Sequence, residues 1–71
     1  MEITYDKDAD AVYIEFRKGE FAKNKKMDDF TILDLDAEGK ILGIELLRVS
    51  ERLPVDSLSE IHVKNLLAVA Q

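Results

Sequence analysis

Carboxylates along the stretch DLDAEGKILGIE, residues 34–45, match the spacing of a calcium-binding EF-hand loop. Asp, Asp, Glu, Gly and Glu stand at its first, third, fifth, sixth and twelfth positions, where such a loop places its oxygen ligands and its glycine. An EF-hand also needs a helix on each side of the loop. Both flanks instead alternate with the two-residue period of strands. We therefore predict a β-hairpin that turns at Gly39, and no calcium site.

A second group of carboxylates lies in the first polar connection, DKDAD at residues 6–10. Close carboxylates can bind Mg²⁺ or Ca²⁺, but aspartate also caps turns by accepting backbone amide hydrogens. The sequence favours the capping role, so no metal site and no cofactor are predicted. A cation that bound weakly at the acidic turns would use Asp6, Asp8, Asp10, Asp36 and Glu38.

Few residues remain that could carry catalysis. His62 is the single histidine, and the chain contains no cysteine. A zinc site and a Ser-His-Asp arrangement are therefore not indicated, and we expect His62 on a helix surface, half covered by the sheet or a neighbour. We predict no catalytic residues and no enzyme. The alternative left open is a weak cation-binding or enzymatic domain that uses the acidic turns.

The connection RKGEFAKNKK, residues 17–26, concentrates the positive charge of the chain. Its cations could contact phosphates, but Glu20 interrupts the run and the net charge of −5 repels a polyanion. We predict a solvated loop between strands and no nucleic-acid partner. A nucleic-acid contact through Lys23, Lys25 and Lys26 is the alternative.

Four segments have the alternation of strands: residues 1–5, 11–17, 30–35 and 41–47. After them Pro54 ends any strand, and Ser57 and Glu60 have the spacing of a capping box. The apolar residues Val63, Leu66, Leu67 and Ala70 then fall on one helical stripe. We predict one helix over residues 58–70.

These elements predict an α+β fold in a single domain, residues 1–71, with the sheet in 1–49 and a helical tail in 54–71. The sheet is expected to be a four-stranded antiparallel meander with the C-terminal helix packed on one face. In a meander, the acidic turns 6–10 and 36–39 share one end of the sheet and the basic connection takes the other. The register stays open, because Gly43 could mark a second bulge.

The strand alternation gives the sheet a leucine-rich face, formed by Leu33, Leu35, Leu42, Ile44 and Leu46. A helix packed on this face would leave apolar side chains bare on the other face. These are Tyr13, Phe30, Ile32, Ile41 and Leu47. Monomers seldom leave a large apolar patch uncovered. We therefore predict that these residues form an interaction surface, used by a homodimer or by a small protein partner.

Composition and charge describe a globular chain, with 46% hydrophobic residues among 71. A chain of this length buries only about 60% of the surface that its unfolded form exposes, and domains of this size often rely on a partner. The N-terminal region has no basic segment followed by an apolar run, and no apolar run is long enough to cross a bilayer. We expect a cytoplasmic protein without membrane contact.

Two motifs resemble the small prokaryotic domain-of-unknown-function family two-two-eight-three: Y-D-x-x-x-D-A-x-Y-I, and a D-x-D-x-x-G turn that leads into a G-I-E-I-L-like strand. The matching residues are Tyr5, Asp6, Asp10, Ala11, Tyr13, Ile14, Asp34, Asp36, Gly39, Gly43, Ile44, Glu45 and Leu47. The resemblance covers about residues 1–50 and implies no established catalytic residue. Some members look like the antitoxin gene beside a small RNase-like toxin, which implies a neutralising role as one option. An acidic chain would associate rapidly with a basic toxin.

Overall fold

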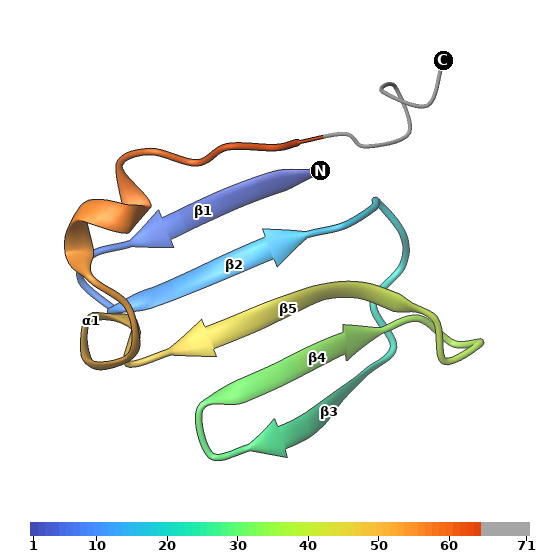
Figure 1. The fold of residues 1–71 in the computed structure, drawn as a ribbon. Coiled ribbons are helices and arrows are strands. Elements are labelled where there is room, and N and C mark those ends of the chain that lie inside the picture. The colour runs from blue at the N-terminus through green and yellow to red at the C-terminus, as the bar shows by residue number, and fades with distance from the viewer. Residues whose placement is uncertain (65–71) are drawn as a thin grey trace.

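The computed structural model describes residues 1–64, which form an antiparallel sheet followed by a short helix (Figure 1). The strands are β1 (Glu2–Asp6), β2 (Ala11–Glu15), β3 (Lys23–Asp28), β4 (Thr31–Leu35) and β5 (Ile41–Leu47). They lie in the order β1-β2-β5-β4-β3. The helix α1 (Val49–Arg52) and the 3₁₀ turn η1 (Val55–Leu58) follow. A sheet with one short C-terminal helix agrees with the predicted α+β class.

The prediction of four strands was wrong, because part of the expected basic loop forms β3. This strand pairs with β4, with Lys23 opposite Leu35 and Lys25 opposite Leu33. All six residues of β3 are exposed, so neither of its faces needs the apolar side chains that reveal a strand in a sequence. Lysines are typical of exposed edge strands, where they oppose pairing with other chains.

The predicted meander order was also wrong. β5 lies between β2 and β4, and the segment 16–22, here called the crossover, connects the end of β2 to the far edge of the sheet (Figure 1). One additional strand reverses the direction of every strand after it. The turns 6–10 and 36–39 therefore lie at opposite ends of the sheet, and the expected single acidic pole does not form.

The turn at Gly39 is a hairpin between β4 and β5, as predicted, and it is not an EF-hand loop. The Asp36 side chain accepts hydrogen bonds from the backbone N–H groups of Glu38 and Lys40, both at 2.9 Å. The N–H of Gly39 donates to the Asp36 carbonyl at 3.0 Å. Gly39 has a φ of 83°, which residues with a side chain rarely adopt.

A bulge at Leu42 settles the register that the sequence left open. Asp34 lies opposite Gly43 and Leu35 lies opposite Ile41, so Leu42 has no residue opposite it. Strict alternation would place Leu42 on the same face as Ile44 and Leu46. Because of the bulge, the Leu42 side chain instead lies with Asp34 on the other face of the sheet, where the two residues line a cavity.

Helix α1 closes one end of the sheet. Val49 is fully buried, and its N–H donates to the carbonyl of Asp10 at 3.0 Å. The Asp10 carboxylate accepts from the N–H and the hydroxyl of Ser50, at 3.0 and 2.7 Å. Arg52 donates to Thr31 Oγ1 at 2.9 Å. These bonds hold α1 over the ends of β2 and β4.

The helix predicted over residues 58–70 does not form in the part that the structure describes. Residues 59–64 have no regular secondary structure, and the rest of the predicted helix lies outside the described residues. Ser57 does not cap a helix, because its hydroxyl donates to the carbonyl of Pro54 at 2.6 Å and so closes η1. Between residues 1 and 64, no helix is long and apolar enough to cross a membrane.

Candidate functional site

The cross-strand register separates the side chains into two faces, because residues directly opposite each other point to the same side. One row consists of Ile3, Ile14, Ile44, Leu33 and Lys25, and the next of Tyr5, Val12, Leu46, Thr31 and Asp28. We call this side the apolar face. The reverse side, here the polar face, carries the row Thr4, Tyr13, Glu45, Ile32 and Lys26.

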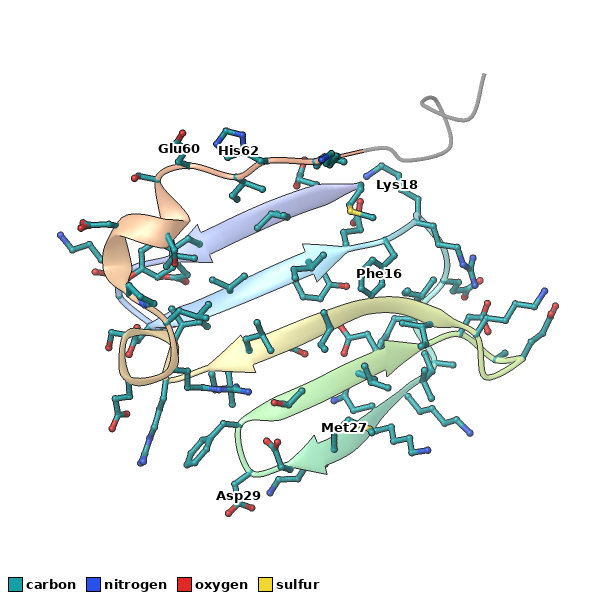
Figure 2. All side chains as sticks on the ribbon, in the orientation of Figure 1. Phe16, Lys18, Met27, Asp29, Glu60 and His62 are labelled. Atoms are coloured by element: carbon teal, nitrogen blue, oxygen red, sulfur yellow. The ribbon has the colours of Figure 1, made fainter. Side chains whose placement is uncertain are left out.

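Residues 1–64 leave most of the apolar face uncovered. Among the described side chains, the buried hydrophobic ones are Val12, Leu35, Leu42 and Val49. Helix α1 covers one end of the face, while the isoleucines and leucines in its middle are only half-buried. At its margins, Ile3 is 37% and Phe16 is 41% exposed. Figure 2 labels Phe16, which extends this face beyond β2.

A core this small is unusual for a folded chain, because burial of apolar surface is the main term that offsets conformational entropy. Contiguous apolar surface that remains exposed commonly marks a contact with another protein. The apolar face is therefore the candidate interaction surface. The alternation of the sequence identified its residues, but the expected covering helix is not found within residues 1–64.

The surface predicted from sequence was the other one, formed by Tyr13, Phe30, Ile32, Ile41 and Leu47. The register places Tyr13, Ile32 and Leu47 on the polar face. Phe30 lies in the β3–β4 turn, where the guanidinium of Arg48 stands 4.6 Å from its ring centroid. Ile41 follows the hairpin and is separated from the others by the bulge. The structure therefore distributes these five residues over different sites.

The polar face contains a cluster that was not predicted, formed by Tyr13, Asp34 and Glu45 around Gly43. A Cβ added at Gly43 would overlap the Tyr13 ring and lie 2.7 Å from the Ile14 carbonyl oxygen. The glycine thus allows the tyrosine to pack directly on the sheet. Asp34 Oδ1 is buried and has no hydrogen-bond partner among the described residues.

Asp34 raises the pKa of two neighbouring groups in this cluster. Burial raises the pKa of Glu45, and the neighbouring Asp34 raises it further. Burial and the charge of Asp34 also raise the pKa of the Tyr13 hydroxyl. When Glu45 is protonated it can donate to Asp34, so that the pair carries one negative charge in place of two. Tyr13, Asp34, Gly43 and Glu45 all occupy positions of the two motifs, which was the signal that could have identified them.

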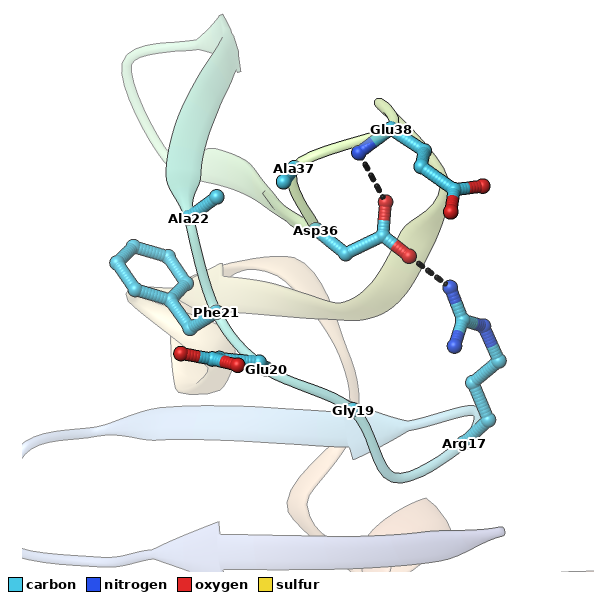
Figure 3. A pocket seen from close by; sticks show the side chains of 8 residues that line it. All are labelled: Arg17, Gly19, Glu20, Phe21, Ala22, Asp36, Ala37 and Glu38. Atoms are coloured by element: carbon cyan, nitrogen blue, oxygen red, sulfur yellow. Dashed lines mark hydrogen bonds and ion pairs between the residues drawn. The ribbon is translucent and has the colours of Figure 1, made fainter.

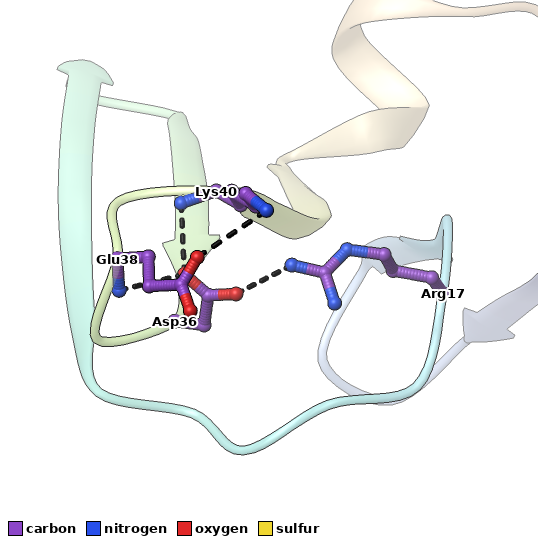
Figure 4. Close-up of polar contacts among 4 residues, drawn as sticks. All are labelled: Arg17, Asp36, Glu38 and Lys40. Carbon is purple, nitrogen blue, oxygen red and sulfur yellow. Dashed lines mark hydrogen bonds and ion pairs between the residues drawn. The ribbon is translucent and has the colours of Figure 1, made fainter.

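The crossover forms a cavity of about 340 Å³ with the β4–β5 turn (Figure 3). Its principal charged groups are already paired. Arg17 donates to Asp36 at 2.5 Å, and Lys40 lies 3.2 Å from Glu38 (Figure 4). The hydrogen bond from the Lys40 N–H, followed by the Arg17 contact, lowers the pKa of Asp36. These contacts tie the crossover to the hairpin and explain the cavity as part of the fold.

The acidic turns use their carboxylates as caps. Asp6 Oδ1 accepts hydrogen bonds from the N–H groups of Asp8 and Ala9, at 3.0 and 3.1 Å, while Asp10 and Asp36 bind α1 and the hairpin as described above. Because the two turns lie at opposite ends of the sheet, the five candidate cation ligands do not converge. Within residues 1–64, no three acidic or histidine side chains are placed to hold a metal ion.

His62 lies on the segment after η1, with its Nε2 2.8 Å from Glu60 Oε1 (Figure 2). Both side chains are largely exposed. The expected position on a helix surface, half covered by a neighbour, was therefore wrong. Among the described residues, the polar contact of the imidazole is with this one exposed carboxylate.

The sequence profile of a family described as "Protein of unknown function (DUF2283)" matches residues 2–50. The matched region covers more than half of the chain and includes all five strands. No curated protein and no solved structure matches the chain at a significant level.

Proposed function

The chain belongs to the DUF2283 family, and we propose that it is a small, non-enzymatic protein-interaction domain that binds through the apolar face of its sheet. The observation that carries this proposal is a contrast within the described residues: four hydrophobic side chains are buried, while most of the apolar face stays uncovered by residues 1–64. In the proposal the domain is prokaryotic, as the resemblance of its motifs implies, and acts in the cytoplasm.

The energetics support a partner on this face. Removing roughly 400 Å² of apolar surface from water contributes about 10 kcal/mol before the costs of association. That is as large as the whole net stability of a typical small domain, about 5–15 kcal/mol. The alternative of a cation-binding or enzymatic domain has less support, since the acidic turns are far apart and act as caps.

A site-specific photo-cross-linker tests the proposal. Benzoylphenylalanine would replace Phe16 on the apolar face or, as the control, Phe21 of the crossover, which is also aromatic and exposed. In cells that express the full chain, the Phe16 position should give a discrete protein adduct and the Phe21 position should not. Absence of an adduct at Phe16, or equal adducts at both positions, contradicts the proposal.

A role as the antitoxin-like member of a toxin–antitoxin pair is a second candidate. The polar face favours it, because Glu2, Glu15, Asp34 and Glu45 give this side of the sheet an acidic character that suits a small basic partner. Co-expression with the product of the adjacent gene tests this role. Restored growth together with a stable complex supports it, and continued growth arrest without a complex contradicts it.

A further inference from the structure

We infer that residues 61–64 (IHVK), here called the strap, can close the free edge of β1 as a sixth, antiparallel strand. The inference goes beyond the proposed function, because it concerns the edge of the sheet and not its apolar face. An extended segment commonly binds a sheet by strand addition, since an edge strand presents unpaired backbone N–H and C=O groups.

The two edges of the sheet differ in how well they are protected. β3 carries three lysines, and its register shifts between Lys26 and Asp28; both features oppose pairing with a further strand. β1 contains neither lysine nor proline, and its register with β2 is continuous from Glu2 to Asp6. Within residues 1–64, no backbone hydrogen bond reaches β1 from its free side. β1 is therefore the edge that is open to another strand.

The strap begins in the conformation of a strand. The Nε2 atom of His62 lies 2.8 Å from Glu60 Oε1. Side chains two residues apart do not face each other on a helix, but they lie on the same side of an extended backbone. The contact therefore shows that the chain is extended on entering the strap, with Ile61 on the opposite side from His62.

The position of the strap in the fold suits antiparallel pairing with β1. The N–H of Val49, at the start of α1, donates to the carbonyl of Asp10. Asp10 precedes Ala11, which pairs with Asp6 at the end of β1. In Figure 1 the chain passes η1 at this end of the sheet and then runs in the direction opposite to β1. Pairing between the two segments therefore needs no crossover.

The apolar side chains of the strap alternate in step with those of β1. Ile3 and Tyr5 point to the apolar face. A register with Val63 opposite Ile3 also sets Ile61 opposite Tyr5, because both segments then alternate with the same period. Ile61 is 52% and Val63 is 87% exposed, so this pairing covers apolar surface that the open strap leaves in water.

The same register suits the charges on the polar face. Lys64 then lies opposite Glu2, and His62 lies opposite Thr4, which points to the polar face. Directly opposed residues of unlike charge stabilise an antiparallel pair. A register shifted by one residue would instead set the basic side chains beside the isoleucine and tyrosine of β1.

Pairs of engineered cysteines test the register, because the chain has no cysteine of its own. One variant combines Thr4→Cys with His62→Cys, and a second combines Ile3→Cys with Val63→Cys. Consecutive cross-strand pairs alternate between two types, and the non-hydrogen-bonded type brings the Cβ atoms close enough for a disulfide. The matched control combines Thr4→Cys with Val63→Cys, which the register places on opposite faces.

Under mild oxidation, at least one of the two matched variants should lose both free thiols while it keeps the mass of a single chain. The control should keep its thiols. Far-UV circular dichroism verifies that each reduced variant is folded, and the second matched variant replaces the first if that one unfolds. Free thiols in both matched variants, equally ready oxidation of the control, or a disulfide that joins two chains overturns the inference.

Discussion

Substitution of Gly43 by alanine tests how the polar face is built. The added Cβ would overlap the ring of Tyr13 and lie 2.7 Å from the carbonyl oxygen of Ile14. The tyrosine could move aside by rotating its side chain. The carbonyl belongs to the backbone of β2, which pairs with β5 at Ile14 and Ile44, so it can move only if the strands separate.

The cost follows from these two contacts. Overpacking of a close contact costs about 1–3 kcal/mol, and weakening a ladder hydrogen bond adds about 0.5–1.5 kcal/mol. Replacing glycine also restricts the unfolded chain, which returns about 0.4–1 kcal/mol. Gly43→Ala should therefore lower the free energy of unfolding by about 2–3 kcal/mol. For a domain of this size, the melting temperature should fall by roughly 10–20 °C.

Urea denaturation followed by far-UV circular dichroism, at one fixed protein concentration, measures this loss. Gly39→Ala is the matched control, because a Cβ there meets open space and only the φ of 83° is unfavourable, at about 1–2 kcal/mol. In a Tyr13→Ala background, the part of the Gly43→Ala cost that comes from the ring should disappear. A Gly43→Ala protein within about 0.5 kcal/mol of the unmodified chain would refute the packing described here.

Glu45 holds its proton more tightly in the folded state, so its stabilising contribution is present at acid pH and is lost as the pH rises through the raised pKa. The change in melting temperature caused by Glu45→Gln should therefore be more positive at pH 8 than at pH 4, by about 2–4 °C. Equal changes at the two pH values would contradict this. Because the pKa of Asp36 is lowered, its ionised form stabilises the fold, and this contribution is lost as the pH falls. Asp36→Ala should melt at a lower temperature than the unmodified chain at neutral pH, and the two melting temperatures should converge near about pH 2. A difference that stays constant with pH would contradict this. Asp10→Ala removes both hydrogen bonds to Ser50 and should lower the free energy of unfolding, measured by urea denaturation, by about 1–2 kcal/mol. Asp10→Asn keeps an acceptor and tolerates the φ of 52°, so its loss of unfolding free energy should be less than half as large. Calcium or magnesium chloride at about 5 mM should leave the melting temperature unchanged, because the ligands that a cation would need lie at opposite ends of the sheet; a clear rise that Asp36→Asn abolishes would show a site.

The strands β1, β2, β4 and β5 could be predicted because each has one face toward an apolar side and therefore alternates clearly. The hairpin at Gly39 could be predicted because a positive φ favours glycine and Asp36 accepts backbone hydrogen bonds. β3 could not be predicted in the same way. An edge strand with both faces in water needs no alternation, so its lysines look like a loop.

The surface was harder to predict than the strands. The sequence identified the leucine-rich face but assigned a helix to cover it, since Ser57 and Glu60 have the spacing of a helix cap; in the structure Ser57 closes a 3₁₀ turn instead. The pairing of Asp34 with Glu45 depends on the bulge at Leu42, which no local pattern specifies. Long-range register, and not residue type, determines which side chains meet.

Isoleucine methyl groups report directly on which side of the sheet is covered. In a solution NMR experiment with a soluble paramagnetic gadolinium chelate, the methyls of Ile14 and Ile44 should relax fast in the free chain, and slowly after addition of the protein that is cross-linked at the Phe16 position. The Ile32 methyl, on the reverse side, should remain accessible with and without that protein. Fast relaxation of Ile14 and Ile44 throughout, with Ile32 shielded, would mean that association uses the other side of the sheet.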